Sequence, residues 1–311
     1  MKNNTTYSTA KRITISIVLL ICGWNLPLNA QQEWGYTQYL FNLYDVNSSY
    51  AGNHNGPSFA ARYRAQWLGF DGAPETQMFS VHTLLAKDHL GAGLKVLNES
   101  IGARRQQQLK ISGSYRLHFD ENILSFGLAG GAIRQTADIS LIKAADEQDA
   151  QLAVFPNSSF TPVIDASIFL SNKKFYAGIE STRLNKSSFH NDGGALARLY
   201  YNINLTAGYM HQVGQNNMIQ LSGLIKYSEG KMWQAEMNLT YLINNKLWFG
   251  AGYRVFTGAV IVSCIHITEH FRLGLSYDVA VKKMRNTNDG SAELYLGYHL
   301  HNRSSKSIRY F

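Results

Sequence analysis

From residue 57 onward, large apolar residues alternate with polar or small ones. In residues 271–279 every odd position is large and apolar, and every even position is polar or Gly. The same alternation runs through residues 109–119, 201–207 and 233–241. Because successive side chains of a strand point to opposite faces, each segment predicts a strand with one apolar and one polar face. No segment after residue 30 has a helical stripe of useful length.

The pattern predicts about fourteen strands separated by turn signals. Several reach ten or more residues, which is the length of a tilted membrane-spanning strand. Typical soluble strands have only about five or six residues. The predicted strands are residues 57–67, 76–83, 89–100, 104–118, 122–136, 160–170, 174–180, 197–212, 217–228, 231–244, 247–254, 259–268, 271–281 and 292–301.

The lengths of the connections between these strands differ by side. If both termini lie on one side, the long connections 68–75, 137–159, 181–196 and 282–291 all fall on the other. Outer-membrane barrels have short periplasmic turns and longer extracellular loops. In hydrocarbon only helices and closed barrels satisfy every backbone polar group. We therefore predict an all-β fold, a transmembrane antiparallel β-barrel of about 14 strands over residues 57–311, with a soluble β-sandwich as the alternative.

The first thirty residues have the features of a secretory signal peptide. Lys2, Lys11 and Arg12 precede an apolar run over residues 13–22, and small residues end at Ala30. This pattern predicts export, with cleavage after Ala30 and insertion in the outer membrane. A lipoprotein cleaved before Cys22 is the alternative. Residues 31–56 are then expected to be a periplasmic segment that plugs the lumen or contacts a partner.

Charge and cysteine content exclude several classes of protein. The formal net charge of +8 falls to about +5 when the signal's three basic residues are removed. Such a mild excess does not indicate a nucleic-acid partner. Only Cys264 would remain in the exported chain, so no intramolecular disulfide is possible, and its apolar surroundings predict a buried thiol.

Aromatic residues lie near the predicted strand ends, where rings favour the bilayer interface. The residues expected to form such aromatic girdles are Trp67, Phe70, Trp248, Phe249, Tyr253 and Phe256.

Candidate chemistry is sparse, and we expect neither enzymatic activity nor a cofactor or metal. No GxSxG, HExxH, CxxC or phosphate-loop motif is present in the sequence. His299 and His301 share a strand face but lack an evident third metal ligand. Alternation also allows Ser80, His82, Asp278 and Glu293 to face the lumen together as a hypothetical catalytic set.

Residues 63–76 read YRAQWLGFDGAPET and resemble the YRNQWxGFxGAPxT block of the PorP/SprF family. Residues 38–42 (QYLFN), 80–82 (SVH) and 309–311 (RYF) extend the resemblance over the mature chain. Ser48 and Ser49 depart from the family's NPAYAG motif, and Ala292 from its GSHEI motif. The matching motif residues are Tyr63, Arg64, Gln66, Trp67, Gly69, Phe70, Gly72, Ala73, Pro74 and Thr76.

The resemblance implies a non-enzymatic barrel of the Bacteroidetes type IX secretion and gliding systems. Such a barrel would sit in outer-membrane lipid and assist export or surface retention of cargo by binding its C-terminal domain. It would contact type IX secretion components or a peptidoglycan-binding periplasmic protein. A passive outer-membrane porin is the alternative function. We expect cargo contact on loops 137–159 and 181–196, chiefly through the mixed charges of Asp138, Lys143, Asp146, Glu147 and Asp149.

Overall fold

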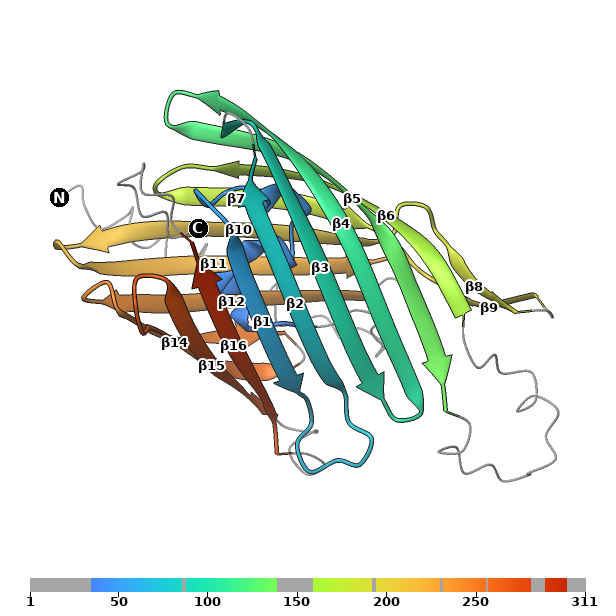
Figure 1. The fold of residues 1–311 in the computed structure, drawn as a ribbon. Coiled ribbons are helices and arrows are strands. Elements are labelled where there is room, and N and C mark those ends of the chain that lie inside the picture. The colour runs from blue at the N-terminus through green and yellow to red at the C-terminus, as the bar shows by residue number, and fades with distance from the viewer. Residues whose placement is uncertain are drawn as a thin grey trace, which may run out of the picture. The chain divides into compact units, whose positions relative to one another are not determined.

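Fourteen antiparallel strands close into a single barrel, which confirms the predicted fold class (Figure 1). The computed structural model describes residues 35–85, 88–138, 159–191, 194–229, 232–255, 257–280 and 289–300. Each strand of the wall pairs with the wall strands before and after it in the chain, and the first strand pairs with the last. Among the described residues, no helix is long and apolar enough to cross a bilayer.

The wall strands lie close to their predicted positions. Their bounds are β1 Ser58–Ala65, β2 Glu75–Leu84, β3 Leu90–Ile101, β4 Arg104–Phe119, β5 Asn122–Ala137, β6 Ser159–Ser171, β7 Phe175–Thr182, β10 Asn202–Val213, β11 Asn217–Ser228, β12 Met232–Ile243, β13 Leu247–Arg254, β14 Gly258–His266, β15 Phe271–Ala280 and β16 Ser291–His299.

The register across the β1 seam defines two ends of the barrel. Arg64 lies opposite Glu293 of β16 and Thr76 of β2, next to the long connections; we call this the long-loop end. Ser58 lies opposite His299 and His82 at the other end, which we call the short-turn end.

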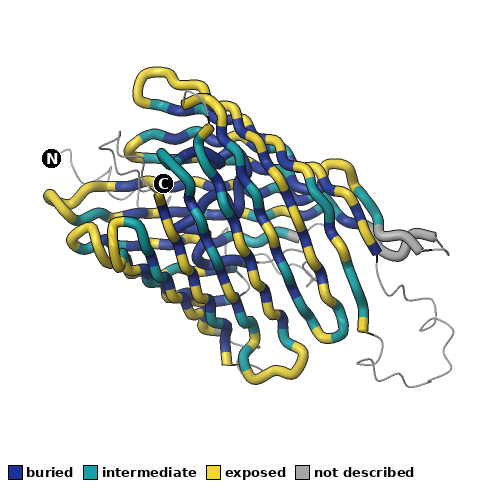
Figure 2. The backbone as a smooth tube through the Cα atoms, in the orientation of Figure 1, coloured by how far each residue is buried: buried dark blue, intermediate teal, exposed yellow. Residues whose placement is uncertain are grey.

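Burial alternates along the wall, as Figure 2 shows in the blue and yellow steps along the strands. On β4, Leu109 and Ile111 are 48% and 64% exposed, whereas Lys110 and Ser112 between them are buried. Leu128 of β5 is 67% exposed. Apolar side chains therefore cover the outside and polar ones line the inside, which is the arrangement of a lipid-facing barrel.

The connection after β7 differs from the prediction. Residues 181–196 were expected to form a loop, but β7 continues to Thr182, and β8 (Ser188–Asn191) pairs with β9 (Gly194–Arg198) as a separate hairpin. The wall strand predicted to begin at residue 197 begins at Asn202 as β10. Alternation indicates strand conformation without specifying the partner, so it does not separate a local hairpin from the wall.

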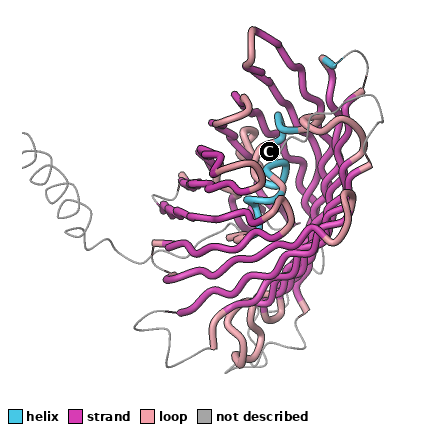
Figure 3. The backbone as a smooth tube through the Cα atoms, turned by 90° about the vertical axis from the view of Figure 1, so that its left-hand side faces the viewer, coloured by secondary structure: helices cyan, strands magenta, loops and turns pink. Residues whose placement is uncertain are grey.

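A segment before β1, residues 35–53, lies inside the barrel (Figure 3). We call it the inner segment. Every residue from Tyr36 to Asn53 is buried. Its three short 3₁₀ helices are η1 (Gln38–Phe41), η2 (Leu43–Asp45) and η3 (Ser48–Tyr50). The Asn47 side chain caps η3 by accepting a hydrogen bond from the Ser49 N–H.

Candidate functional site

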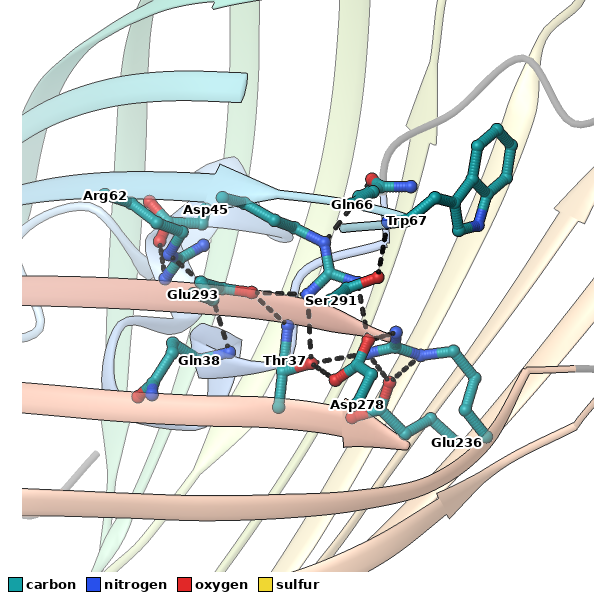
Figure 4. Close-up of polar contacts among 12 residues, drawn as sticks. Thr37, Gln38, Asp45, Arg62, Gln66, Trp67, Glu236, Asp278, Ser291 and Glu293 are labelled. Atoms are coloured by element: carbon teal, nitrogen blue, oxygen red, sulfur yellow. Dashed lines mark hydrogen bonds and ion pairs between the residues drawn. The ribbon is translucent and has the colours of Figure 1, made fainter. Parts of the chain in front are cut away.

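The long-loop end of the lumen contains a buried network of arginines and carboxylates (Figure 4). Arg64 pairs with Asp278 at 2.5 Å and with Glu293 at 3.0 Å. Arg254 pairs with the same Asp278 at 2.7 Å and with Glu236 at 2.6 Å. The residues come from β1, β12, β13, β15 and β16, so the network ties together strands that are far apart in sequence.

The start of the inner segment is bound by this network. The Thr37 N–H donates to Glu293 at 2.9 Å, and its hydroxyl donates to Asp278 at 2.9 Å. Arg254 Nη2 in turn donates to Thr37 Oγ1 at 2.8 Å. Thr37 is therefore bound both by carboxylates and by an arginine, and hydrogen bonds to charged groups are stronger than those between neutral groups.

A second anchor lies at Asp45, at the end of η2. Arg62 Nη2 contacts its carboxylate at 2.6 Å, and the Ser80 hydroxyl donates to it at 3.0 Å. Lys95 Nζ donates to the Asp45 carbonyl at 2.9 Å. Burial raises the pKa of Asp45, and the neighbouring Arg62 and Lys95 charges act in the opposite direction. Arg62 and Lys95 therefore place two positive charges beside the buried Asp45.

The third anchor is η3, which lies against β5, β6 and β7. The Ser48 N–H and hydroxyl both donate to Glu180 Oε1, at 2.9 and 2.6 Å. The Ser49 N–H donates to Ser167 Oγ at 2.8 Å. A Cβ added at Gly127 would lie 2.6 Å from the Ser49 backbone, so only Gly at this position lets η3 approach the wall.

The inner segment ends at the short-turn end. Arg116 Nη1 donates to the Gly52 carbonyl at 2.7 Å, and the Gly52 N–H donates to His82 Nδ1 at 3.4 Å. The segment therefore runs from one end of the lumen to the other, with polar contacts along its whole length.

The family-type motif over residues 63–76 shapes the first long loop and contributes to the network. Tyr63 points outward, Arg64 inward and Thr76 inward. Gly72 has φ of +72°, where Gly is favoured, and its carbonyl accepts from the Gly102 N–H at 2.9 Å.

The remaining motif residues connect this loop to itself and to β16. The Gln66 N–H donates to the Pro74 carbonyl at 2.9 Å, and the Ala73 N–H to the Phe70 carbonyl at 3.2 Å. The Trp67 N–H donates to Ser291 Oγ at 3.2 Å. Gly69 has φ of +83°.

Most of the described girdle aromatics are exposed, but Trp248 contradicts the prediction. Trp67, Phe70, Phe249 and Tyr253 are at or near the outer surface. Trp248 is only 3% exposed and packs against Phe41 of the inner segment, with ring centroids 6.3 Å apart. Its position near a strand end predicted an interface ring, but the parity of β13 turns it inward opposite Cys264.

The hypothetical catalytic set does not assemble. Ser80 contacts Asp45 and Asn42, while His82 accepts from Gly52. Asp278 and Glu293 are bound to arginines. His299 Nδ1 contacts Ser58 Oγ at 2.7 Å, and His301 lies outside the described residues. Within the described ranges no three His, Cys, Asp or Glu side chains are placed so that they could hold a metal ion together. Cys264 is buried, as predicted.

Several predicted features fall outside the described residues. They are the signal region 1–30, Lys143, Asp146, Glu147, Asp149 and Phe256. Asp138 is described at the end of β5, where its N–H donates to the Ala103 carbonyl at 2.8 Å.

The inner-segment contacts were missed by sequence reasoning. Polar positions on the inner faces of the strands were recognised, but the pattern does not say which of them meet. The one available signal was the presence of inward glycines such as Gly127 among larger residues.

Solved structures with a similar fold are outer-membrane barrels. The toluene transporter TbuX of Ralstonia pickettii matches with a TM-score of 0.51 and 9% identity over 86% of this chain and 94% of its own. The Acinetobacter baumannii outer membrane protein Omp33 matches with a TM-score of 0.45 and 11% identity, over 79% and 99%. At these identities TbuX shows the barrel fold alone. No curated protein matches the sequence.

The sequence model of one family, described as type IX secretion system membrane protein PorP/SprF, matches residues 28–298. That range covers all fourteen wall strands apart from the last residue of β16, together with the inner segment. With its outward apolar face and closed antiparallel wall, the chain is an outer-membrane β-barrel that belongs to the type IX secretion system membrane protein PorP/SprF family.

Proposed function

We propose that this barrel is a non-enzymatic docking component of type IX secretion, which binds the C-terminal domain of secreted cargo for export or surface retention. The observation that carries the proposal is the inner segment, which is anchored at Thr37, Asp45 and Ser48 along the length of the lumen. A barrel with its interior occupied in this way is suited to present surfaces rather than to pass solutes.

The long-loop end supplies the surface for cargo. Its loops include the turn at residues 66–74, held by the Gln66–Pro74 and Ala73–Phe70 backbone hydrogen bonds, and the β8–β9 hairpin, both of which extend beyond the wall strands (Figure 1). Asn185 and Ser187 fix the base of the hairpin connection by donating to the Pro162 carbonyl, at 2.8 and 2.7 Å. Binding loops on a rigid scaffold are a common arrangement for recognition. Asp138, which follows β5, is at the same end. We assign cargo contact to it and to the charged residues that follow it in the sequence, Lys143, Asp146, Glu147 and Asp149.

The short-turn end would then face the periplasm and meet secretion components or a peptidoglycan-binding protein. Support comes from the sorting of connection lengths, since outer-membrane barrels place short turns on the periplasmic side. The turn residues Asp120 and Glu121 are exposed at this end.

The test is capture from detergent-solubilised outer membranes with mass spectrometry of the bound proteins. One variant replaces residues 189–197 with a Gly-Ser linker, which keeps Asn185 and Ser187. The matched variant changes Asp120 and Glu121 to Ser at the opposite end. We expect the first to lose cargo and keep periplasmic partners, and the second to keep cargo. Equal cargo capture by wild type and the linker variant, combined with loss in the turn variant, would contradict the assignment of ends.

A passive porin is the competing function. It requires a lumen open to ions, so steady conductance of the wild-type protein in planar bilayers would favour it over docking.

A further inference from the structure

Basic side chains gather at the short-turn end of the lumen. His54 lies 4.5 Å from His299 and 5.6 Å from His82 between ring centroids. Arg272 of β15 lies directly opposite His266 of β14 in the register, on the inner face. Arg116 and His82 both bind Gly52, through its carbonyl and its N–H, and Arg272 lies opposite Gly297, two residues before His299. We call Arg116, Arg272, His54, His82, His266 and His299 the basic cluster.

Arg272 differs from the arginines of the long-loop end. Arg62, Arg64 and Arg254 each contact two carboxylates. Arg272 is only 9% exposed, and its Nε and Nη2 atoms have no hydrogen-bond partner among the described residues. A buried charge of this kind is unfavourable unless an opposite charge is close.

Among the residues that the structure describes, the carboxylates near this end either lie at the surface or are paired with other cations. The acidic residues on the turns of this end, Asp88, Asp120, Glu121 and Glu269, are exposed at the surface. Asp45, Asp165 and Asp278 are already paired with other cations.

Two histidine side chains at this end add neutral hydrogen-bond donors to the charge of Arg272. His82 Nδ1 accepts from the Gly52 N–H, so a neutral His82 carries its proton on Nε2. That Nε2 is buried without a partner in the described structure, and so is Nε2 of His266. A guanidinium with imidazole N–H groups beside it is a donor set that matches the oxygens of an oxyanion.

We propose that the basic cluster is a binding site for an oxyanion, a phosphate or a carboxylate group, which pairs with Arg272 and accepts from His82 and His266. His266 is half-buried, so the site is reached from the short-turn end. This site is independent of cargo docking at the long-loop end.

The test is a titration of the purified full-length protein in detergent with inorganic phosphate, against chloride at the same ionic strength. Thermal unfolding is followed by tryptophan fluorescence. We expect a saturable rise in Tm for wild type and for Arg105→Gln, which changes an exposed arginine at the other end. For Arg272→Gln we expect the phosphate dissociation constant to rise at least tenfold. A parallel titration with acetate separates a phosphate ligand from a carboxylate ligand, and a saturable shift with either anion supports the site.

A second readout uses protein without phosphate. Because Arg272→Gln removes an unpaired buried charge, its Tm should be no lower than that of wild type. If Arg272→Gln does not assemble, His266→Gln is titrated instead, with an expected weakening of at least threefold. No saturable shift in wild type, or the same shift in wild type and these variants, would overturn the proposal.

Discussion

Replacing Gly127 with Ala should release η3 from the barrel wall. The added Cβ would lie 2.6 Å from both the N and the Cα of Ser49, whereas ordinary contacts are 3.4–4 Å. Because these are backbone atoms, no rotamer change relieves the overlap, and η3 must move by roughly 1 Å. Such a shift lengthens the Ser49–Ser167 and Ser48–Glu180 hydrogen bonds, which measure 2.8 and 2.9 Å.

The free-energy cost of Gly127→Ala follows from the overpacking and from the two weakened hydrogen bonds. Overpacking costs about 1–3 kcal/mol, and each of the two hydrogen bonds contributes about 0.5–1.5 kcal/mol. Docking of the inner segment should therefore weaken by about 2–6 kcal/mol. Since each 1.4 kcal/mol is about tenfold, its opening equilibrium should rise roughly 30-fold or more.

The assay is hydrogen exchange of residues 36–53, followed by mass spectrometry on the protein in detergent. Gly130→Ala on the same strand is the matched control, because its Cβ would meet nothing within 4 Å. The control should exchange like wild type while Gly127→Ala exchanges faster in the inner segment alone. Equal exchange in the two variants would refute the placement of η3 against β5.

Three further predictions concern the wall and the network. Arg64→Met leaves Asp278 and Glu293 with one cation fewer and should lower the free energy of unfolding in urea by about 3–5 kcal/mol. The control Lys173→Met removes an exposed ion pair of 3.9 Å and should change this free energy by less than about 1 kcal/mol. Similar losses in the two variants would argue against a buried network. Leu128→Arg places a charge on the outward face and should cost about 2–4 kcal/mol of folding free energy in lipid vesicles; no loss would mean that this face does not contact lipid. The buried Cys264 thiol should not react with a maleimide until urea unfolds the barrel, and rapid labelling of the native protein would contradict its packing.

The wall could be predicted from sequence because its signal is local. Alternation, as in residues 271–279, reports which face each side chain takes, and the connection lengths report how the strands are ordered. Trp248 shows that closeness to a strand end is not enough to predict an interface ring. Alternation along β13 turns its side chain into the lumen, where it packs on Phe41.

The candidate site could not be predicted because its contacts join distant segments. Thr37 meets Glu293 and Asp278 across more than 240 residues, and nothing in the local pattern pairs them. Arg64 was singled out only as a motif residue, and its partners follow from barrel closure between β1 and β16. The hairpin at residues 188–198 was missed because β8 and β9 have only four and five residues, which is too short for alternation to separate them from a loop, and because the last two residues of β9 were assigned to the following wall strand.

Single-channel recording in planar bilayers tests most directly whether the inner segment occupies the lumen. Purified wild-type protein and Gly130→Ala should leave the bilayer without steady conductance, whereas Gly127→Ala should show intermittent openings as the inner segment leaves the wall. A steady open-pore conductance in the wild-type protein, unchanged by Gly127→Ala, would contradict a filled barrel.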